Sequence, residues 1–404
     1  MWTDESKDRF GDLPDSAVFD ILSYLKTKEA VQTCILSKRW NNLTNNLPII
    51  TLDCDQFKSL DSFERALSQI LSVRNEFDDV LDTLDLALTE FDSYDDFPQS
   101  TDEVFKRMVR YALSHSVRRL RYPITSHINP FPPVFSSQTL TSLDLSVPGR
   151  FLQPTVVILF PTHLNLPSLT NLTLTSFGFG PDDDGCADPF AAFNKLNTLT
   201  IIYCGVVNSP FRGGIYRGVD YNRSLKLRIS PPSLCTFAFT GNISLELCLT
   251  HPCSLKHLHI DAEGFDDSSL VQDYSALLLT WLQGFPNITS LTLSSNTLQL
   301  LSLVPGLFKV KLTSLYNLES LQVQMKPLSS QLYTILCCGE FMIPGVELYQ
   351  ATIVPDGVVD CLIQNSPSAN VTFIPYNKIQ DPREVKMKDP RRRRRRRGRK
   401  AKQI

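Results

Sequence analysis

The chain has 404 residues, of which 42% are hydrophobic, so it can bury a large core and extend over more than one domain. Its formal net charge is −2, but residues 391–404 carry ten basic groups and no acidic one, which leaves a net charge of −12 for residues 1–390. The body is therefore acidic and the C-terminal segment basic, and the longest apolar run, residues 156–160, is far too short to cross a membrane.

Ten cysteines are scattered along the chain, and no Cys-x-x-Cys pair occurs. The first eight residues are acidic and polar, so we expect no secretory leader. This cysteine usage indicates a reducing compartment in which most thiols are free and buried.

Residues 9–40 contain three short helix signals and more apolar surface than so small a unit can bury alone. Pro14 can occupy the first helical position, where its missing N–H costs nothing. A wide apolar stripe follows, and Thr27 and Ser37 can cap a second and a third helix. The stripe consists of Ala17, Val18, Ile21, Leu22 and Leu25. We therefore predict a three-helix unit over residues 9–46 that needs a partner surface or a neighbouring domain to complete its core.

Three motifs stand out in this unit: Leu13-Pro14, Ile21-Leu22-Ser23-Tyr24-Leu25 and Leu36-Ser37-Lys38-Arg39-Trp40. Through these motifs the unit resembles an F-box, in the form common in plant F-box proteins with leucine-rich repeats. The resemblance implies docking onto the Skp-type adaptor of a Skp–cullin–F-box (SCF) ubiquitin ligase and, through that adaptor, onto a cullin. The contacts that it implies are Leu13, Pro14, Ile21, Leu36 and Trp40. The alternative is that these side chains only form the core of the small unit against the domain that follows.

One short pattern, apolar-x-x-apolar-x-apolar, recurs nine times beyond residue 75. Its last two positions have the period-two spacing of a strand, and its first position packs the entering turn. The copies are Leu81/Leu84/Leu86, Val117/Leu120/Tyr122, Leu140/Leu143/Leu145, Leu169/Leu172/Leu174, Leu196/Leu199/Ile201, Leu234/Phe237/Phe239, Leu255/Leu258/Ile260, Ile288/Leu291/Leu293 and Leu318/Leu321/Val323. This is the signature of leucine-rich repeats with long, irregular units. We therefore predict an α/β fold over residues 50–375, a curved leucine-rich-repeat solenoid with a parallel sheet on its concave side.

Some intervals between the copies are long enough for helices. Apolar residues at helical spacing predict helices at residues 63–71, 104–112 and 274–282. In a final unit, a helix over residues 356–364 is expected to precede a strand at residues 371–373. The resemblance to the plant F-box and leucine-rich-repeat family extends over these repeats, without an evident FBD domain.

In each copy, the side chains that flank the penultimate apolar residue point to the open side of the sheet. In order, these pairs are Thr83/Asp85, Arg119/Arg121, Ser142/Asp144, Asn171/Thr173, Thr198/Thr200, Thr236/Ala238, His257/His259, Ser290/Thr292 and Ser320/Gln322. Charge is concentrated in the early pairs. We predict that this face binds an unknown protein substrate through Arg119, Arg121, Asp144, His257 and His259. The alternative is that the polar residues are ordinary solvated strand residues.

No catalytic constellation is visible: Gly-x-Ser-x-Gly, Walker and His-Glu-x-x-His motifs do not occur. A grouping of metal-ligand types, His251, Cys253, His257 and His259, lacks the second pair that would complete a tetrahedral site. We therefore expect no metal, no cofactor and no enzyme activity. The implied mechanism is proximity, which raises the effective concentration of a bound substrate's lysines near an activated ubiquitin held elsewhere in the complex.

The C-terminal segment has a dense basic run, formed by Arg391, Arg392, Arg393, Arg394, Arg395, Arg396, Arg397, Arg399 and Lys400. It can be a nuclear-import signal read by an import receptor, a non-specific RNA or DNA contact, or a disordered run with no selected role, which can fold back onto the acidic body. No aromatic residues are interleaved, so base stacking finds no support, and we expect no nucleic-acid partner. We expect residues 376–404 to be disordered and the protein to occupy nucleus and cytoplasm. The expected role is substrate recognition within an SCF ligase; the alternatives are a repeat scaffold without ligase function and a nucleic-acid-binding protein that acts through the basic run.

Overall fold

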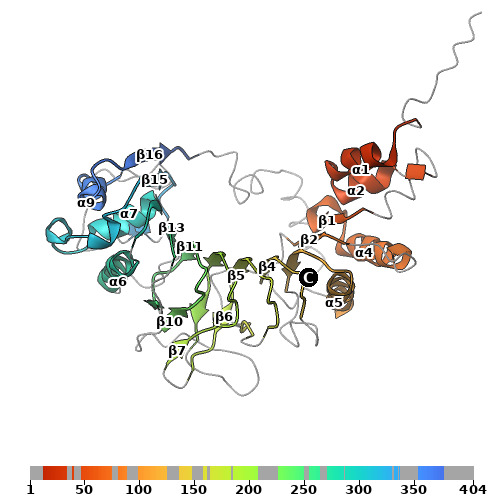
Figure 1. The fold of residues 1–404 in the computed structure, drawn as a ribbon, viewed down its shortest axis with the longest axis horizontal. Helices are drawn as coiled ribbons and strands as arrows, with labels where there is room; N and C mark the ends of the chain where they lie inside the picture. The colour runs from red at the N-terminus through yellow and green to blue at the C-terminus, as the bar shows by residue number, and fades with distance from the viewer. Residues whose placement is uncertain are drawn as a thin grey trace, which may run out of the picture.

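The computed structural model describes residues 12–33, 39–40, 47–74, 81–88, 99–124, 136–147, 158–161, 164–182, 185–207, 226–249, 254–263, 271–285, 287–329, 332–334, 336 and 354–376. Over these residues the protein is a mixed α/β structure, with helices near the amino end followed by an eleven-stranded parallel sheet. Figure 1 shows the strands following one another along an arc. Apart from Tyr376, the segment 376–404 lies outside the described residues, so its predicted disorder stays a prediction.

Two short helices near the amino end, α1 (Asp15–Ser23) and α2 (Thr27–Gln32), share a small core of their own. That core consists of Val18, Leu22, Ala30, Trp40 and Leu47. Pro14 is the N-cap residue with extended backbone, so α1 begins one residue later than predicted. Thr27 is the first residue of α2 and not its cap. Of the predicted third helix, only residues 39–40 are described.

The large sheet is parallel throughout and keeps the order of the chain. Its strands are β1 (Ile49–Asp53), β2 (Thr83–Ala87), β3 (Arg119–Pro123), β4 (Ser142–Ser146), β5 (Asn171–Thr175), β8 (Thr198–Ile202), β11 (Thr236–Gly241), β13 (His257–Ala262), β14 (Ser290–Ser294), β15 (Ser320–Gln324) and β16 (Asn370–Ile374). Each predicted copy of the repeat pattern coincides with one strand. Leu143 and Leu145 of β4 are at most 1% exposed and pair in register with the buried Leu172 and Leu174 of β5. The apolar positions therefore stack from strand to strand into one continuous core.

Helices and two small sheets fill the intervals between these strands. The helices are α4 (Leu60–Arg74), α5 (Gln99–Ser114), α6 (Val271–Gly284), α7 (Ser295–Ser302) and α9 (Val358–Ile363), with the 3-10 turns η2 (Cys54–Gln56), η5 (Leu307–Lys309) and η6 (Thr313–Leu315). The small sheets pair β7 (Cys186–Ala187) and β12 (Glu246–Leu249) with β10 (Lys226–Ile229), and β6 (Gly178–Phe179) with β9 (Gly205–Val206). In Figure 1, α4, α5, α6 and the β7–β10–β12 sheet lie on the outer side of the arc. Within the described part of the chain, no helix has the length and apolar character that crossing a membrane requires.

The amino-terminal helices are joined to the first strand by side-chain hydrogen bonds. The hydroxyl oxygen of Thr27 accepts the N–H of Thr51 in β1 at 2.7 Å. The buried Arg74 at the end of α4 donates to the carbonyl of Leu47 at 2.7 Å, and Lys28 donates to the carbonyl of Gln56. These bonds satisfy backbone groups at the edge of the sheet, so the helical unit covers that edge and its orientation relative to the sheet is fixed.

Candidate functional site

The amino-terminal helices leave large apolar side chains on the surface. Ile21, Tyr24 and Val31 are 40%, 90% and 44% exposed. These side chains project from a unit whose own core is already small. Three exposed apolar side chains on so small a unit fit the expectation of a partner surface.

The residues predicted to contact an adaptor occupy different environments. Ile21 and Pro14 are exposed, while Leu13 is half-buried against the small core. Trp40 is only 5% exposed, because its large indole fills the interior of the helical unit. Leu36 lies outside the described residues. Trp40 is thus a core residue of the free chain, and the role of these residues in adaptor binding stays a prediction.

Tyr24 and Val31 both lie within the F-box segment of the sequence, but neither was predicted to contact the adaptor. Tyr24 lies three residues after Ile21, at the C-cap of α1, and Val31 lies on α2. The three-residue spacing of Ile21 and Tyr24 was visible in the sequence. What the sequence could not show is which apolar positions of the two helices face inward.

The side chains on the open face of the large sheet form two rows. The first row contains Thr83, Arg119, Ser142, Asn171, Thr198, Thr236, His257, Ser290 and Ser320, and the second contains Asp85, Arg121, Asp144, Thr173, Thr200, Ala238, His259, Thr292 and Gln322. Every predicted pair of flanking residues is in register with the pair on the next strand. The register therefore places the predicted charges of β2, β3 and β4 side by side.

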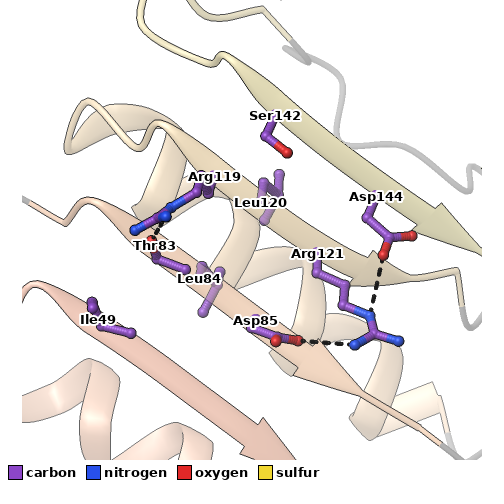
Figure 2. A pocket seen from close by; sticks show the side chains of 9 residues that line it. All are labelled: Ile49, Thr83, Leu84, Asp85, Arg119, Leu120, Arg121, Ser142 and Asp144. Carbon is purple, nitrogen blue, oxygen red and sulfur yellow. Dashed lines mark hydrogen bonds and ion pairs between the residues drawn. The ribbon is translucent and has the colours of Figure 1, made fainter. Parts of the chain in front are cut away.

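Three of the predicted substrate contacts, Arg119, Arg121 and Asp144, line one pocket with a volume of about 450 Å³. Figure 2 shows this charged pocket, which Ile49, Thr83, Leu84, Asp85, Leu120 and Ser142 complete. Nε of Arg121 lies 3.4 Å from the carboxylate of Asp144, and its Nη1 lies 3.9 Å from that of Asp85. The guanidinium of Arg119 turns the other way and donates to the hydroxyl of Thr83 at 2.9 Å.

The carboxylates of the pocket are incompletely compensated. Burial raises the pKa of Asp85 above its ordinary value; the Arg121 guanidinium opposes this shift and the Asp53 carboxylate adds to it. Burial likewise raises the pKa of Asp144, with Arg121 opposing and Asp85 adding. Both distances from Arg121 are longer than those of a tight, charge-assisted hydrogen bond. The single guanidinium of Arg121 therefore neutralises the two carboxylates only partly.

His257 and His259 do not belong to the charged pocket. They lie on β13, five strands along the sheet from β3, which corresponds to about 24 Å. His259 instead lies on the same strand as Asp261, and burial lowers the pKa of its imidazole. Asp261 raises that pKa and Lys326 lowers it further.

Next to His259 lies a buried charged cluster that sequence reasoning missed. Lys326 donates to Asp261 and, at 3.0 Å, to Glu263, and the hydroxyl of Tyr203 also donates to Glu263. Asp261 is only 2% exposed. These residues lie at or just beyond the ends of strands from different repeats, so only the register of the sheet brings them together.

One group of residues has the types of a metal site. Side-chain ligand atoms of Asp53, Cys54 and Asp55 lie within 4.8 Å of one another. However, the carboxylate of Asp53 accepts the N–H of Asp55 at 3.0 Å, as the cap of η2, so a local turn accounts for the arrangement. His251 and Cys253 of the grouping considered in the sequence lie outside the described residues. The expectation of no metal or cofactor stays a prediction.

Comparison with known proteins assigns the amino-terminal unit. The family model described as F-box domain matches residues 10–52. Over 221 residues, the chain is 26% identical to F-box protein At5g03100 of Arabidopsis thaliana, covering 55% of this chain and 62% of that protein. It is 24% identical over 390 residues to F-box protein At1g60400, covering 90% and 89%, and 24% identical over 321 residues to F-box/LRR-repeat protein At5g02910, covering 74% and 62%, both of the same plant.

The chain thus carries an F-box domain at its amino end. Its relatives include plant F-box proteins and F-box/LRR-repeat proteins. This agrees with the resemblance seen in the sequence. The chain spans 62% of the length of the first relative named and 89% of the second.

Proposed function

We propose that the protein is a substrate-recognition subunit of an SCF ubiquitin ligase, in which the helical unit binds a Skp-type adaptor and, through it, a cullin. The observation that carries this proposal is the F-box match over residues 10–52, on a unit that leaves Ile21, Tyr24 and Val31 exposed. Burial of such side chains against an apolar groove would contribute about 25 cal/mol per Å².

The large parallel sheet is the substrate-presenting part of this proposal. Strands that follow chain order in one parallel sheet, with helices and small sheets in the intervals, support a leucine-rich-repeat solenoid. We propose an F-box over residues 9–46, repeats over residues 50–375 and a disordered tail over residues 376–404. The open face binds a protein target, and the protein itself supplies no catalytic group.

The proposed mechanism is positioning. The adaptor end and the substrate face belong to one body, because Thr27, Lys28 and Arg74 tie the helices to the first strands. A rigid connection holds a bound target at a fixed place relative to the ubiquitin-bearing part of the complex, which raises the effective concentration of its lysines there.

The experiment that tests this role is ubiquitin transfer by a reconstituted complex of the full chain, a plant Skp-type adaptor, a cullin and the remaining ligase components. The readout is modification of the chain itself, which requires no identified substrate. Tyr24→Asp should abolish modification, because a charge in an apolar contact is desolvated without a partner. The matched control is Phe308→Asp, which changes another exposed aromatic residue, 62% exposed, in the turn η5 between β14 and β15. Equal loss in both variants, or in neither, contradicts the proposal and favours a scaffold without ligase function.

We further propose that the protein is distributed between nucleus and cytoplasm and that the basic run serves as an import signal. Ten basic groups in residues 391–404 stand against a body of net charge −12, so the segment presents a charge that an acidic receptor groove can bind. Replacement of the seven arginines at 391–397 by serine should move a fluorescent fusion toward the cytoplasm while adaptor binding is retained. An unchanged nuclear signal contradicts the proposal; loss of salt-dependent RNA retention in the same variant favours a nucleic-acid role.

A further inference from the structure

The charged pocket of the open face has ends of opposite charge. At the amino end of the strands, Arg118 and Arg119 share the single carboxylate of Asp82, at 4.0 and 2.9 Å. At the carboxyl end, Asp85 and Asp144 share the single guanidinium of Arg121. One end therefore has a formal charge of +1 and the other a charge of −1.

The positive end keeps hydrogen-bond donors for a ligand. Arg119 uses Nε for Thr83 and Nη2 for Asp82, each at 2.9 Å. These two bonds fix the plane of the guanidinium, and among the described residues no partner occupies its Nη1. The side chain is 58% exposed, so Nη1 can reach an acidic group outside the protein.

The negative end keeps acceptors for a ligand. Oδ1 of Asp85 accepts no hydrogen bond from the described residues and is paired with Nη1 of Arg121 only at 3.9 Å. The side chains of Asp85 and Asp144 are 30% and 34% exposed, so a ligand can reach both of them. The Asp53 carboxylate, on the neighbouring strand, adds a further negative charge that acts on Asp85.

We propose that this pocket binds an extended segment of the protein substrate in which an acidic and a basic side chain are two residues apart. The acidic group pairs with Arg119. The basic group lies on the solvent side of Asp85 and Asp144, whose side chains are 30% and 34% exposed, because Arg121 occupies the space between them. Arg119 and Arg121 are two residues apart on one strand, and side chains at i and i+2 of an extended peptide have the same spacing of about 6.6 Å. The segment lies along the strands with both charges facing the sheet. This inference rests on the proposed function only in taking the open face as the substrate face.

A second source of the basic group is the protein's own C-terminal run. Arg391 is 15 residues beyond Tyr376, and 15 residues of extended chain reach about 50 Å. The sheet from β16 to β3 measures about 38 Å, eight strand spacings. The run carries no acidic residue, so it can occupy only the negative end.

The test uses four fluorescent dodecapeptides that differ at two central positions, Glu-x-Arg, Arg-x-Glu, Glu-x-Glu and Arg-x-Arg, with the full chain and with a chain that lacks residues 391–404. Because an extended peptide can lie in either direction, both mixed-charge peptides should bind. Each correct pairing should improve the Kd about three- to fivefold, the range of partly exposed ion pairs. Same-charge peptides of equal or higher affinity overturn the proposal.

Two pocket variants identify the contacts. With Asp85→Asn and Asp144→Asn together, the mixed-charge peptides should no longer bind more tightly than Glu-x-Glu. With Arg119→Gln, they should no longer bind more tightly than Arg-x-Arg. Asp360→Asn, an exposed carboxylate on α9, is the matched control and should change neither preference. Unchanged preferences in both pocket variants overturn the assignment of the contacts. Binding that occurs only after removal of residues 391–404 assigns the negative end to the protein's own run and overturns the assignment to a substrate.

Adaptor binding is measured on the same variants. A chain that binds the adaptor but shows no charge preference contradicts this inference and leaves the proposed function standing. A chain that shows the charge preference but binds no Skp-type adaptor contradicts the ligase role and leaves the peptide site standing.

Discussion

Thr27 is the residue whose replacement most specifically tests the joint between the helical unit and the sheet. Thr27 is only 6% exposed, and its hydroxyl oxygen accepts a hydrogen bond from the N–H of Thr51 at 2.7 Å. Thr27→Val keeps the branched shape but removes the acceptor, so the N–H of Thr51 loses its partner. An unsatisfied buried donor costs about 1–3 kcal/mol. A loss of about 2 kcal/mol corresponds to an opening of this joint that is about 30-fold more frequent.

The assay is amide hydrogen exchange of the full chain. In Thr27→Val, the peptide that contains Thr51 should exchange about 30-fold faster, while peptides from β14 keep their rates, because the opening is local. Thr27→Ser is the matched control: it keeps the acceptor and loses one methyl group, about 0.8 kcal/mol, and should retain slow exchange. Equal exchange of the Thr51 peptide in wild type and Thr27→Val refutes the reasoning that this bond fixes the joint.

Three further outcomes are expected. Lys326→Met should reduce the free energy of unfolding by about 2–3 kcal/mol, because it leaves the buried Asp261 without its cation. A loss below 0.5 kcal/mol in urea titrations would show that the Lys326–Asp261 ion pair does not stabilise the fold. Burial lowers the pKa of His259 in the folded protein, so the folded state favours the neutral imidazole. The stability that this residue contributes is complete above the unfolded pKa of 6.5 and is lost as the pH falls through the lower pKa of the folded state. His259→Gln should therefore flatten the fall of the urea midpoint between pH 7.5 and 5, and an unaltered slope excludes this residue as the cause. Trp281→Phe should lower stability by about 2–4 kcal/mol, since the indole N–H donates to the carbonyl of Leu245 at 3.0 Å and the ring packs edge-on against Phe239 at 4.9 Å; a change within 0.5 kcal/mol on thermal unfolding contradicts this.

The strands could be predicted because their apolar pairs have a period of two and lie between turn residues. The same pattern occurs once more as Leu47/Ile50/Leu52 and forms β1, a strand that was not among the nine predicted copies. The predicted strand at residues 371–373 is β16, but Phe373 is 51% exposed although its register partner Val323 is buried. The pattern predicts a strand and its inward side, but not whether another strand follows to cover it.

Elements without amphipathic periodicity escaped prediction. Seven of the eight residues of α7 are buried, including Asn296 and Gln299, so the helix has no polar face that a sequence pattern could reveal. The two-residue strands β6, β7 and β9 are too short to show any alternation. Both depend on tertiary packing, which overrides local preference.

The candidate sites were predictable to the extent that they follow register. Arg119, Arg121 and Asp144 were named from the alternation alone, and the parallel register brings them into one pocket. Asp85 was seen as a row member but not as a contact, because the sharing of one guanidinium between two carboxylates depends on side-chain geometry. Trp40 matched the motif, yet its burial could not be read from spacing.

The most direct test of the central claim is amide hydrogen exchange of the full chain with and without a purified plant Skp-type adaptor. The account predicts that peptides covering α1 and α2, with Ile21, Tyr24 and Val31, exchange more slowly in the complex. Peptides covering β2, β3 and β4, which line the charged pocket, should keep their rates. No slowing in α1 and α2 at saturating adaptor, or slowing confined to β2–β4, would contradict the assignment of the helical unit as the adaptor-binding end.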